Sequence, residues 1–256
     1  MWLVSVANAQ DGVPGTHIRF ITLGELYRLD RPSGHLLHIE EIPKGVQPPI
    51  KIRYSSGSEM KGLDLPLRQF SPYATFKGDD ETLILKNIAT DGGGDFLKFP
   101  APKGEMNLGV LFANHGTRNW LDPKILMLKD DAKSFPTGEI RFVNASDHTV
   151  LVKIEGHPPF GIKAGSTSRK TLKDIGTLKG GKFVQPLDDR ASMKLAYRNS
   201  KNVGYELYSS DLKIDKDMRI QCFFFKSKKA GSAKGVKHVL HFEKLPSVPE
   251  PPKRPR

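Results

Sequence analysis

The chain has 256 residues, of which 38% are hydrophobic and 27% are charged, and its formal net charge at pH 7 is +12. This balance excludes an intrinsically disordered chain. The one cysteine, Cys222, excludes an intramolecular disulfide. No apolar run reaches the roughly 18 residues that a membrane-spanning helix needs. The length is sufficient for two domains of ordinary size, each with its own core.

The excess of positive over negative charge lies entirely in the second half of the chain. Residues 1–136 contain 16 Lys or Arg and 16 Asp or Glu, whereas residues 137–256 contain 24 basic and 12 acidic residues. A positive potential there attracts polyanionic glycans, lipid head groups or nucleic acid. Solubility charge on exposed strand faces and loops is the simpler explanation of the same excess.

The first residues resemble the end of an export signal. Trp2 to Val6 form an apolar segment, and Ala7-Asn8-Ala9 fits the small-x-small cleavage pattern, with Gln10 as the first mature residue. The basic start of such a signal is missing. We therefore expect residues 1–15 to be the remnant of a signal peptide and a lead-in, and the protein to be exported to the periplasm or outside of a bacterium. A short amino-terminal strand of the first domain is the alternative.

Short alternating runs of apolar and polar residues recur along the chain, separated by Gly, Pro, Asn and Asp. This spacing is typical of an all-β sandwich or barrel. In residues 218–224 the alternate side chains of Ile220, Cys222 and Phe224 point to one face, so Cys222 is expected to be a buried apolar residue, not a nucleophile. The predicted strands include residues 18–21, 50–54, 82–86, 108–112, 150–154, 194–197, 219–225 and 237–242.

The chain also repeats itself in a constant order. The run His17-Ile18-Arg19-Phe20-Ile21 returns as Glu139-Ile140-Arg141-Phe142-Val143, at an offset of 122. Such self-similarity predicts an all-β fold of two tandem antiparallel β-sandwich domains related by internal duplication. The further matches are Phe76-Lys77-Gly78, Leu83 and Leu85 with Tyr197-Arg198-Asn199, Tyr205 and Leu207; 96–99 with 211–214; 106–112 with 218–224 at an offset of 112; and 124–128 with 237–241 at 113.

The repeat predicts the domain boundaries. After the lead-in at residues 1–15, the first β-sandwich spans residues 16–136 and the second, basic β-sandwich spans residues 137–245. Residues 246–256 form a basic tail that contains five prolines. Because proline cannot join a sheet interior, this tail is expected to be extended.

The spacings typical of catalytic nucleophiles, phosphate loops and metal-binding cysteines are not present. Asp91-Gly92-Gly93-Gly94-Asp95 comes nearest to a calcium loop, but further oxygen ligands are missing, so a plain hairpin loop is favoured over a metal site. Asp79-Asp80-Glu81 and Asp188-Asp189 fall between predicted strands, where Asp stabilises turns. We therefore expect no catalytic residue, metal or cofactor. Surface or interstrand positions are expected for the histidines, which are His17, His35, His38, His115, His148, His157, His238 and His241.

The strongest cationic stretch is a loop between two predicted strands, in which lysines alternate with small residues. It is the expected contact for an anionic glycan or another envelope polymer, with a solvated loop as the alternative. Nucleic acid is a less expected partner, because arginine and aromatic side chains for base stacking are missing there. The proposed contact residues are Lys226, Lys228, Lys229, Lys234 and Lys237.

Part of the second domain carries a recurring strand-and-turn pattern, in Ile140-Arg141-Phe142-Val143-Asn144-Ala145-Ser146, then Val150-Leu151-Val152-Lys153-Ile154, then Gly161-Ile162-Lys163-Ala164-Gly165-Ser166. This pattern resembles that of uncharacterised exported bacterial β-sandwich proteins. It covers about thirty residues and implies an immunoglobulin-like or related sandwich. The first domain departs from this pattern, since Leu23-Gly24-Glu25 stands where Asn-Ala-Ser would be.

Together these features favour a non-catalytic, exported structural or binding protein of the cell envelope. A glycan-active hydrolase, whose carboxylates come together only in the folded chain, is one alternative. A cytoplasmic nucleic-acid-binding protein is another, and it requires Trp2 to Ala9 to be part of the fold.

Overall fold

The structure is a computed structural model, and it describes residues 15–25, 45, 47–77, 81–87, 94–114, 119–155, 157–172, 177–179, 182–184, 190–198, 204–213, 215, 217–226 and 235–245. Over these residues the regular elements are 18 β-strands, which form four four-stranded sheets and one hairpin. The all-β prediction is therefore confirmed. The predicted signal remnant and the proline-rich tail lie outside the described residues.

The first eight strands form domain 1, a sandwich of two sheets. Sheet A has the order β4-β1-β7-β8, and sheet B has the order β3-β2-β5-β6. Apolar side chains that alternate along the strands, such as Ile18 and Phe20 of β1 and Ile52 and Tyr54 of β2, fill the space between the sheets. The strands are β1 (Thr16–Leu23), β2 (Lys51–Ser56), β3 (Glu59–Asp64), β4 (Ala74–Phe76), β5 (Thr82–Asn87), β6 (Asp95–Pro100), β7 (Met106–Phe112) and β8 (Lys124–Lys129).

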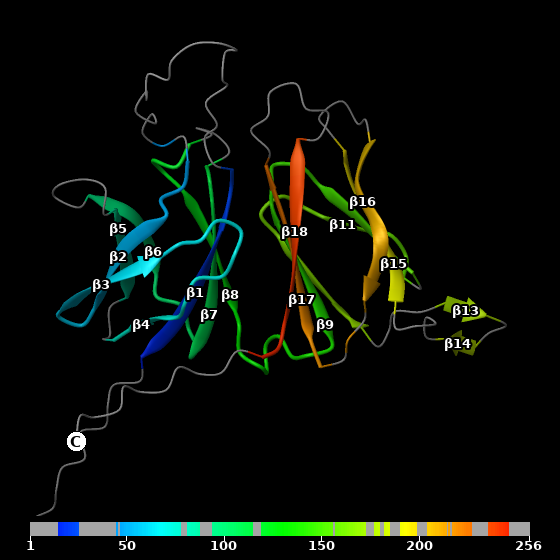
Figure 1. The fold of residues 1–256 in the computed structure, drawn as a ribbon, viewed down its shortest axis with the longest axis horizontal. Coiled ribbons are helices and arrows are strands. Elements are labelled where there is room, and N and C mark those ends of the chain that lie inside the picture. Colours follow the sequence, from blue (N-terminus) through cyan, green and yellow to red (C-terminus); the bar gives the residue numbers. More distant parts are fainter. Residues whose placement is uncertain are drawn as a thin grey trace, which may run out of the picture.

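The remaining strands form domain 2. Sheet C has the order β12-β9-β17-β18, sheet D has the order β11-β10-β15-β16, and β13 and β14 form a hairpin that projects from the domain (Figure 1). The strands are β9 (Glu139–Ala145), β10 (Val150–Ile154), β11 (Phe160–Ile162), β12 (Thr167–Thr171), β13 (Thr177–Lys179), β14 (Lys182–Val184), β15 (Arg190–Arg198), β16 (Gly204–Lys213), β17 (Arg219–Lys226) and β18 (Val236–Glu243).

The two domains share one topology. When the β13–β14 hairpin is set aside, the eight strands of domain 2 have the same neighbours, in the same order, as β1 to β8. This confirms the predicted duplication. Sheets B and D are antiparallel, as predicted, whereas sheets A and C are mixed, because β1 pairs in parallel with β7, and β9 in parallel with β17. A parallel pair joins strands from the two ends of each domain, which the local alternation pattern does not encode.

The strand registers correct two of the predicted matches. Arg19 is paired with Leu108, and its equivalent Arg141 is paired with Gln221, so β7 corresponds to β17 at an offset of 113 and not 112. A shift of one residue exchanges the two faces of a strand, so this difference decides which residues are equivalent. The match of Phe76 with Tyr197 and of Leu83 and Leu85 with β16 was also wrong. In the shared topology the equivalent of β4 is β12, whereas Tyr197 lies in β15, and the equivalent of β5 is β15.

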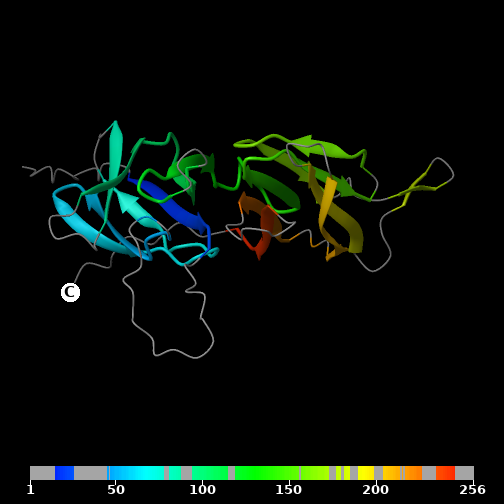
Figure 2. The ribbon, with the colours of Figure 1, turned by 90° about the horizontal axis from the view of Figure 1, so that it is seen from above.

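The four sheets are stacked in the order B, A, C, D, as Figures 1 and 2 show in two perpendicular views. Sheets A and C pack face to face through a third apolar cluster that lies between the domain cores. Each domain nevertheless has its own core. The strands β1, β7, β9 and β17 are consequently covered on both faces, which explains the nearly continuous burial along them.

Candidate functional site

The two described ends of the predicted basic loop, Lys226 and Gly235, lie at one end of domain 2, where strand β9 of sheet C leads into strand β10 of sheet D. Asn144, at the end of β9, is fully buried and organises this corner. Its Nδ2 donates hydrogen bonds to the backbone oxygens of His148 and Ile162, at 2.8 and 2.9 Å, and its Oδ1 accepts from the Ser146 hydroxyl at 2.7 Å. The Asn144 backbone also bonds to Gly165 and Ser166. The residues of the resemblance thus form one hydrogen-bonded corner.

Three rings stack beside this corner. His148 stacks on Tyr197, and Tyr197 stacks on Tyr205, with ring centroids 5.2 Å apart in both pairs. Tyr197 is buried, whereas His148 and Tyr205 are partly exposed. The stack joins the β9–β10 turn to β15 and β16 at this end of the sandwich.

Both ends of the basic loop are attached to this framework. At the start of the loop, the Lys226 ammonium forms an ion pair with Asp147. At the end, the Gly235 backbone N–H donates a 2.6 Å hydrogen bond to the Tyr197 hydroxyl. Lys237 then forms an ion pair with Glu25 of domain 1. We call this region the loop end of domain 2; its described residues are Asn144, Asp147, His148, Tyr197, Tyr205, Lys226, Gly235 and Lys237.

The ion pairs divide the five predicted contact lysines into two groups. Lys226 and Lys237 are held by carboxylates, as just described. Lys228, Lys229 and Lys234 lie outside the described residues. Burial alone would raise the pKa of Asp147, but the hydrogen bond and charge of Lys226 lower it below its ordinary value. Asp147 therefore stays ionised at neutral pH and holds the start of the loop.

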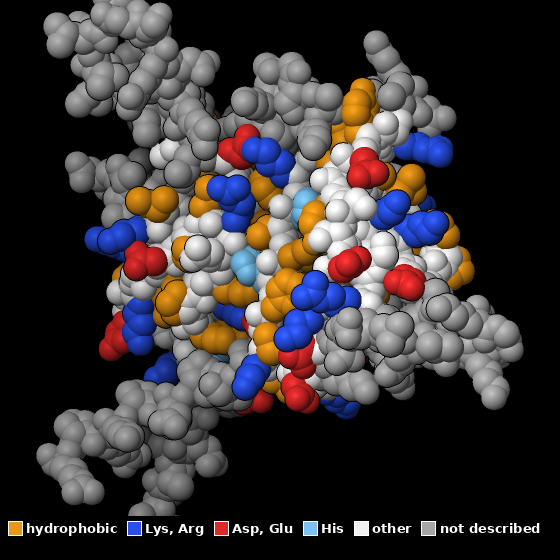
Figure 3. Space-filling model, turned by 45° about the vertical axis from the view of Figure 1, so that its right-hand side comes forward, with side chains coloured by type: hydrophobic (Ala, Val, Ile, Leu, Met, Phe, Trp, Pro, Cys, Tyr) orange, Lys and Arg blue, Asp and Glu red, His pale blue; other side chains and the backbone are white. Residues whose placement is uncertain are grey.

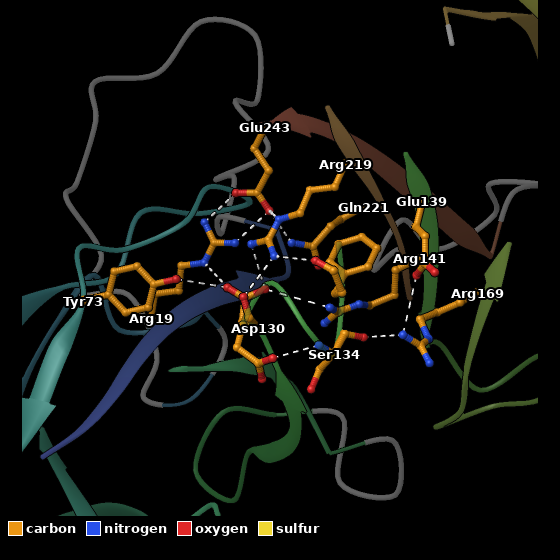
Figure 4. Close-up of polar contacts among 12 residues, drawn as sticks. Arg19, Tyr73, Asp130, Ser134, Glu139, Arg141, Arg169, Arg219, Gln221 and Glu243 are labelled. Carbon is orange, nitrogen blue, oxygen red and sulfur yellow. Dashed lines mark hydrogen bonds and ion pairs between the residues drawn. The ribbon is translucent and has the colours of Figure 1, made fainter. Parts of the chain in front are cut away.

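A second polar site lies between the domains, and sequence reasoning missed it. We call it the interdomain ionic cluster; Figure 4 shows it with its neighbours. The Arg19 guanidinium donates to both oxygens of Glu243, at 2.6 and 2.7 Å, and to Asp130 at 2.7 Å. Arg219 bonds to Asp130 at 2.9 Å and to Glu243 at 3.1 Å. The cluster consists of Arg19, Asp130, Arg141, Arg219, Gln221 and Glu243.

Arg141 completes the cluster from β9. Its guanidinium lies 3.8 Å from the centroid of the Phe135 ring, and its Nη2 is 3.9 Å from Asp130. Burial lowers the pKa of Arg141 to about 10, although the Asp130 carboxylate counteracts this effect. Three guanidinium groups thus share two carboxylates, and aromatic rings cover Arg19 and Arg141.

The carboxylates of this cluster are arranged to hold the domains together. A general acid or base must lie within hydrogen-bond reach of a substrate, whereas Asp130 is fully buried and both carboxylates already accept several charge-assisted hydrogen bonds. Such bonds keep the pKa of Glu243 below its ordinary value, against the opposing effect of burial. The chemistry of the cluster is therefore that of a structural ion-pair network.

The other predicted residues are dispersed. Asp95 is exposed and pairs with Lys98 at 2.8 Å, while residues 91–93, Asp79, Asp80, Asp188 and Asp189 lie outside the described residues. Cys222 is fully buried, as predicted. Among the described histidines, His17 bonds to Thr75, His238 packs on Tyr208 and His241 packs on Phe70. Within the described residues, no three His, Cys, Asp or Glu side chains are grouped to hold a metal ion.

The surface of the described residues mixes charges of both signs. On the face in Figure 3, Lys and Arg are interspersed with Asp and Glu, and apolar side chains lie between them. Phe242, at the end of β18, is 47% exposed. The part of the chain that the structure describes contains no helix with the length and apolarity needed to cross a membrane.

Comparison with known proteins gives no matching family model and no significantly similar curated protein.

Proposed function

We propose that this protein is a non-catalytic binding module that attaches to a polyanion through the loop end of domain 2. The observation that carries the proposal is the attachment of the basic loop at both ends, through Lys226 to Asp147 and through Gly235 to Tyr197. Fixing the two described ends of a loop lowers the entropy that binding must overcome.

The charge of the loop favours an anionic ligand. Residues 226–237 contain five lysines and no acidic residue. Because Asp147 and Glu25 neutralise the two outer lysines, the three central ones supply the net positive charge. Their spacing by Ser, Ala and Gly suits contact with spaced sulfate, carboxylate or phosphate groups. An anionic glycan or envelope polymer fits better than nucleic acid, since the loop offers no arginine or aromatic side chain for base stacking.

The proposal includes export from a bacterial cell. The apolar segment at Trp2 to Val6 and the cleavage pattern at Ala7-Asn8-Ala9 support it. Sequencing the amino terminus of the mature protein tests this part separately: Gln10 as the first residue supports export, and an intact Met1 contradicts it.

Retention on immobilised heparin, a sulfated glycan, tests the contact. Replacing Lys228, Lys229 and Lys234 by Gln removes three charges, so the protein is expected to elute at lower salt and to show a shallower dependence of binding on salt. The matched control replaces Lys153, Lys163 and Lys194, which are exposed on the same domain.

The comparison of the two triple variants decides the proposal. An equal shift in both would mean that heparin responds to net charge alone, and unchanged elution of the loop variant would remove the loop from the contact. A parallel column of single-stranded DNA distinguishes the partners, since tighter retention on DNA at the same salt would favour the nucleic-acid alternative.

A further inference from the structure

The two domains contact each other through the same face of the same fold. Sheet A uses the face that points away from its own core, and sheet C, its counterpart in domain 2, does the same. Many of the apolar residues in this contact are equivalent in the duplication. Five pairs of equivalent residues belong to this apolar cluster: Ile21 and Val143, Leu23 and Ala145, Val110 and Phe223, Phe112 and Phe225, and Leu126 and Val239.

The ionic contacts across the interface are reciprocal as well. At the offsets set by the strand registers, Arg141 is the equivalent of Arg19, and Glu243 is the equivalent of Asp130. Arg19 of domain 1 pairs with Glu243 of domain 2, and Arg141 of domain 2 faces Asp130 of domain 1. When residue i contacts j and the equivalent of i contacts the equivalent of j, the interface is isologous, as in a two-fold dimer.

We infer that the contact between sheets A and C is a two-fold subunit interface built into one chain, and that the face of domain 1 also fits a second copy of domain 1. In that pair, each Arg19 would meet the Asp130 of the other copy, at the place where Glu243 now lies. The two guanidinium groups would then be balanced by two carboxylates. The apolar part of the face, formed by Ile21, Leu108 and Val110, is self-complementary in the same way.

The face of domain 2 is more polar, since Gln221 stands where domain 1 has Leu108 and His241 stands where it has Leu128, and at one position it also differs in charge. Arg219 is fully buried in the interface, and its equivalent in domain 1 at the offset of 113 is Met106. Two copies of domain 2 would therefore enclose four guanidinium groups, from Arg141 and Arg219, against two Glu243 carboxylates. Uncompensated buried charge is strongly unfavourable, so domain 2 selects domain 1 and rejects a second copy of itself.

The test uses the full chain with a cut linker. A site for a specific protease is inserted between Ala132 and Lys133, which are both exposed, and the folded protein is cleaved. Native mass spectrometry is expected to show the two halves as a one-to-one pair. Phe223→Asp then disables the face of domain 2, while leaving its own core intact because Phe223 points away from that core.

In the cleaved Phe223→Asp protein, the expected result is a pair of two domain 1 halves, and adding Val110→Asp is expected to leave them single. Single or precipitated domain 1 halves in the Phe223→Asp protein, or a persisting one-to-one pair, would overturn the inference. Arg219→Met tests the charge argument: combined with Val110→Asp in cleaved protein, it is expected to produce pairs of domain 2 halves. Val110→Asp alone must leave the domain 2 halves single, and pairing there would contradict the charge argument.

Discussion

The ring of Phe20 lies directly against Gly109, its partner in the parallel β1–β7 pair. A Cβ atom at Gly109 would stand 2.6 Å from Cδ1 of this ring and 3.2 Å from Cδ1 of Ile125. The equivalent pair in domain 2 is Phe142 with Cys222, again a large ring beside a small residue. Strands β7 and β17 thus make room for a phenylalanine of β1 and of β9, respectively.

Gly109→Ala is therefore expected to destabilise the protein by about 1–3 kcal/mol, the usual cost of adding a methyl group to a filled core. The control is Gly62→Ala on the exposed strand β3, where no atom lies within 4 Å of the added Cβ. Urea denaturation of both variants measures the difference. Equal stability of the two variants would contradict the close contact.

Arg19→Met removes the guanidinium that joins Glu243 to Asp130. Because it leaves the buried Asp130 and the partly buried Glu243 carboxylates with fewer donors, a loss of about 3–5 kcal/mol in the free energy of unfolding is expected. Arg53→Met on the exposed side of β2 serves as the control, with a change within about 0.5 kcal/mol. Denaturant titration distinguishes the two, and a tolerated Arg19→Met would show that the cluster contributes little.

The stability of the protein should fall in acid because of Glu243. Its pKa in the folded state lies below the ordinary value of 4.5, since the hydrogen bond from Arg19 and the charges of Arg19 and Arg219 outweigh the effect of burial. A depressed pKa stabilises the fold at pH values above the unfolded pKa, and this stabilisation is lost as the pH falls through the folded pKa.

The free energy of unfolding is therefore expected to decrease from about pH 4.5 downward, with a smaller decrease in Glu243→Gln. Urea titrations at a series of pH values measure both slopes. Identical slopes in the two proteins would assign the acid sensitivity to other carboxylates, such as Asp147, whose pKa burial raises but the ion pair with Lys226 lowers further, to below its ordinary value.

The thiol of Cys222 provides a chemical probe of the opening of domain 2. Its side chain is fully buried, and burial raises the pKa of the thiol, so little thiolate forms at neutral pH. We expect the native protein to resist a thiol reagent and to react stoichiometrically in denaturant. The rate in native buffer should follow the opening of domain 2, and fast labelling without denaturant would contradict this burial.

Tyr197→Phe tests the attachment of the basic loop. The variant keeps the ring stack with His148 but removes the acceptor of the Gly235 N–H, so a loss of about 0.5–1.5 kcal/mol is expected. Limited digestion with trypsin, which cleaves after lysine, should become faster within residues 227–234. Tyr208→Phe is the control, since its ring packs on His238 elsewhere.

Local patterns predicted the strands and the duplication, because alternation and repetition are properties of neighbouring residues. The run Cys222-Phe223-Phe224-Phe225 also indicates the stacking of sheets, because a continuous apolar strand is typical of burial on both faces. The ionic cluster could not be predicted in this way. Arg19 and Glu243 are 224 positions apart, and only the parallel pairing and the sheet stacking bring them together.

The stacking of sheets A and C has a consequence for higher-order assembly. An isologous contact is saturated once two copies of the face have met, so it closes and cannot propagate into a filament. The duplication places both copies in one molecule, which satisfies the contact at any concentration. Any larger array of these molecules has to be built from other surfaces, such as the outer sheets B and D.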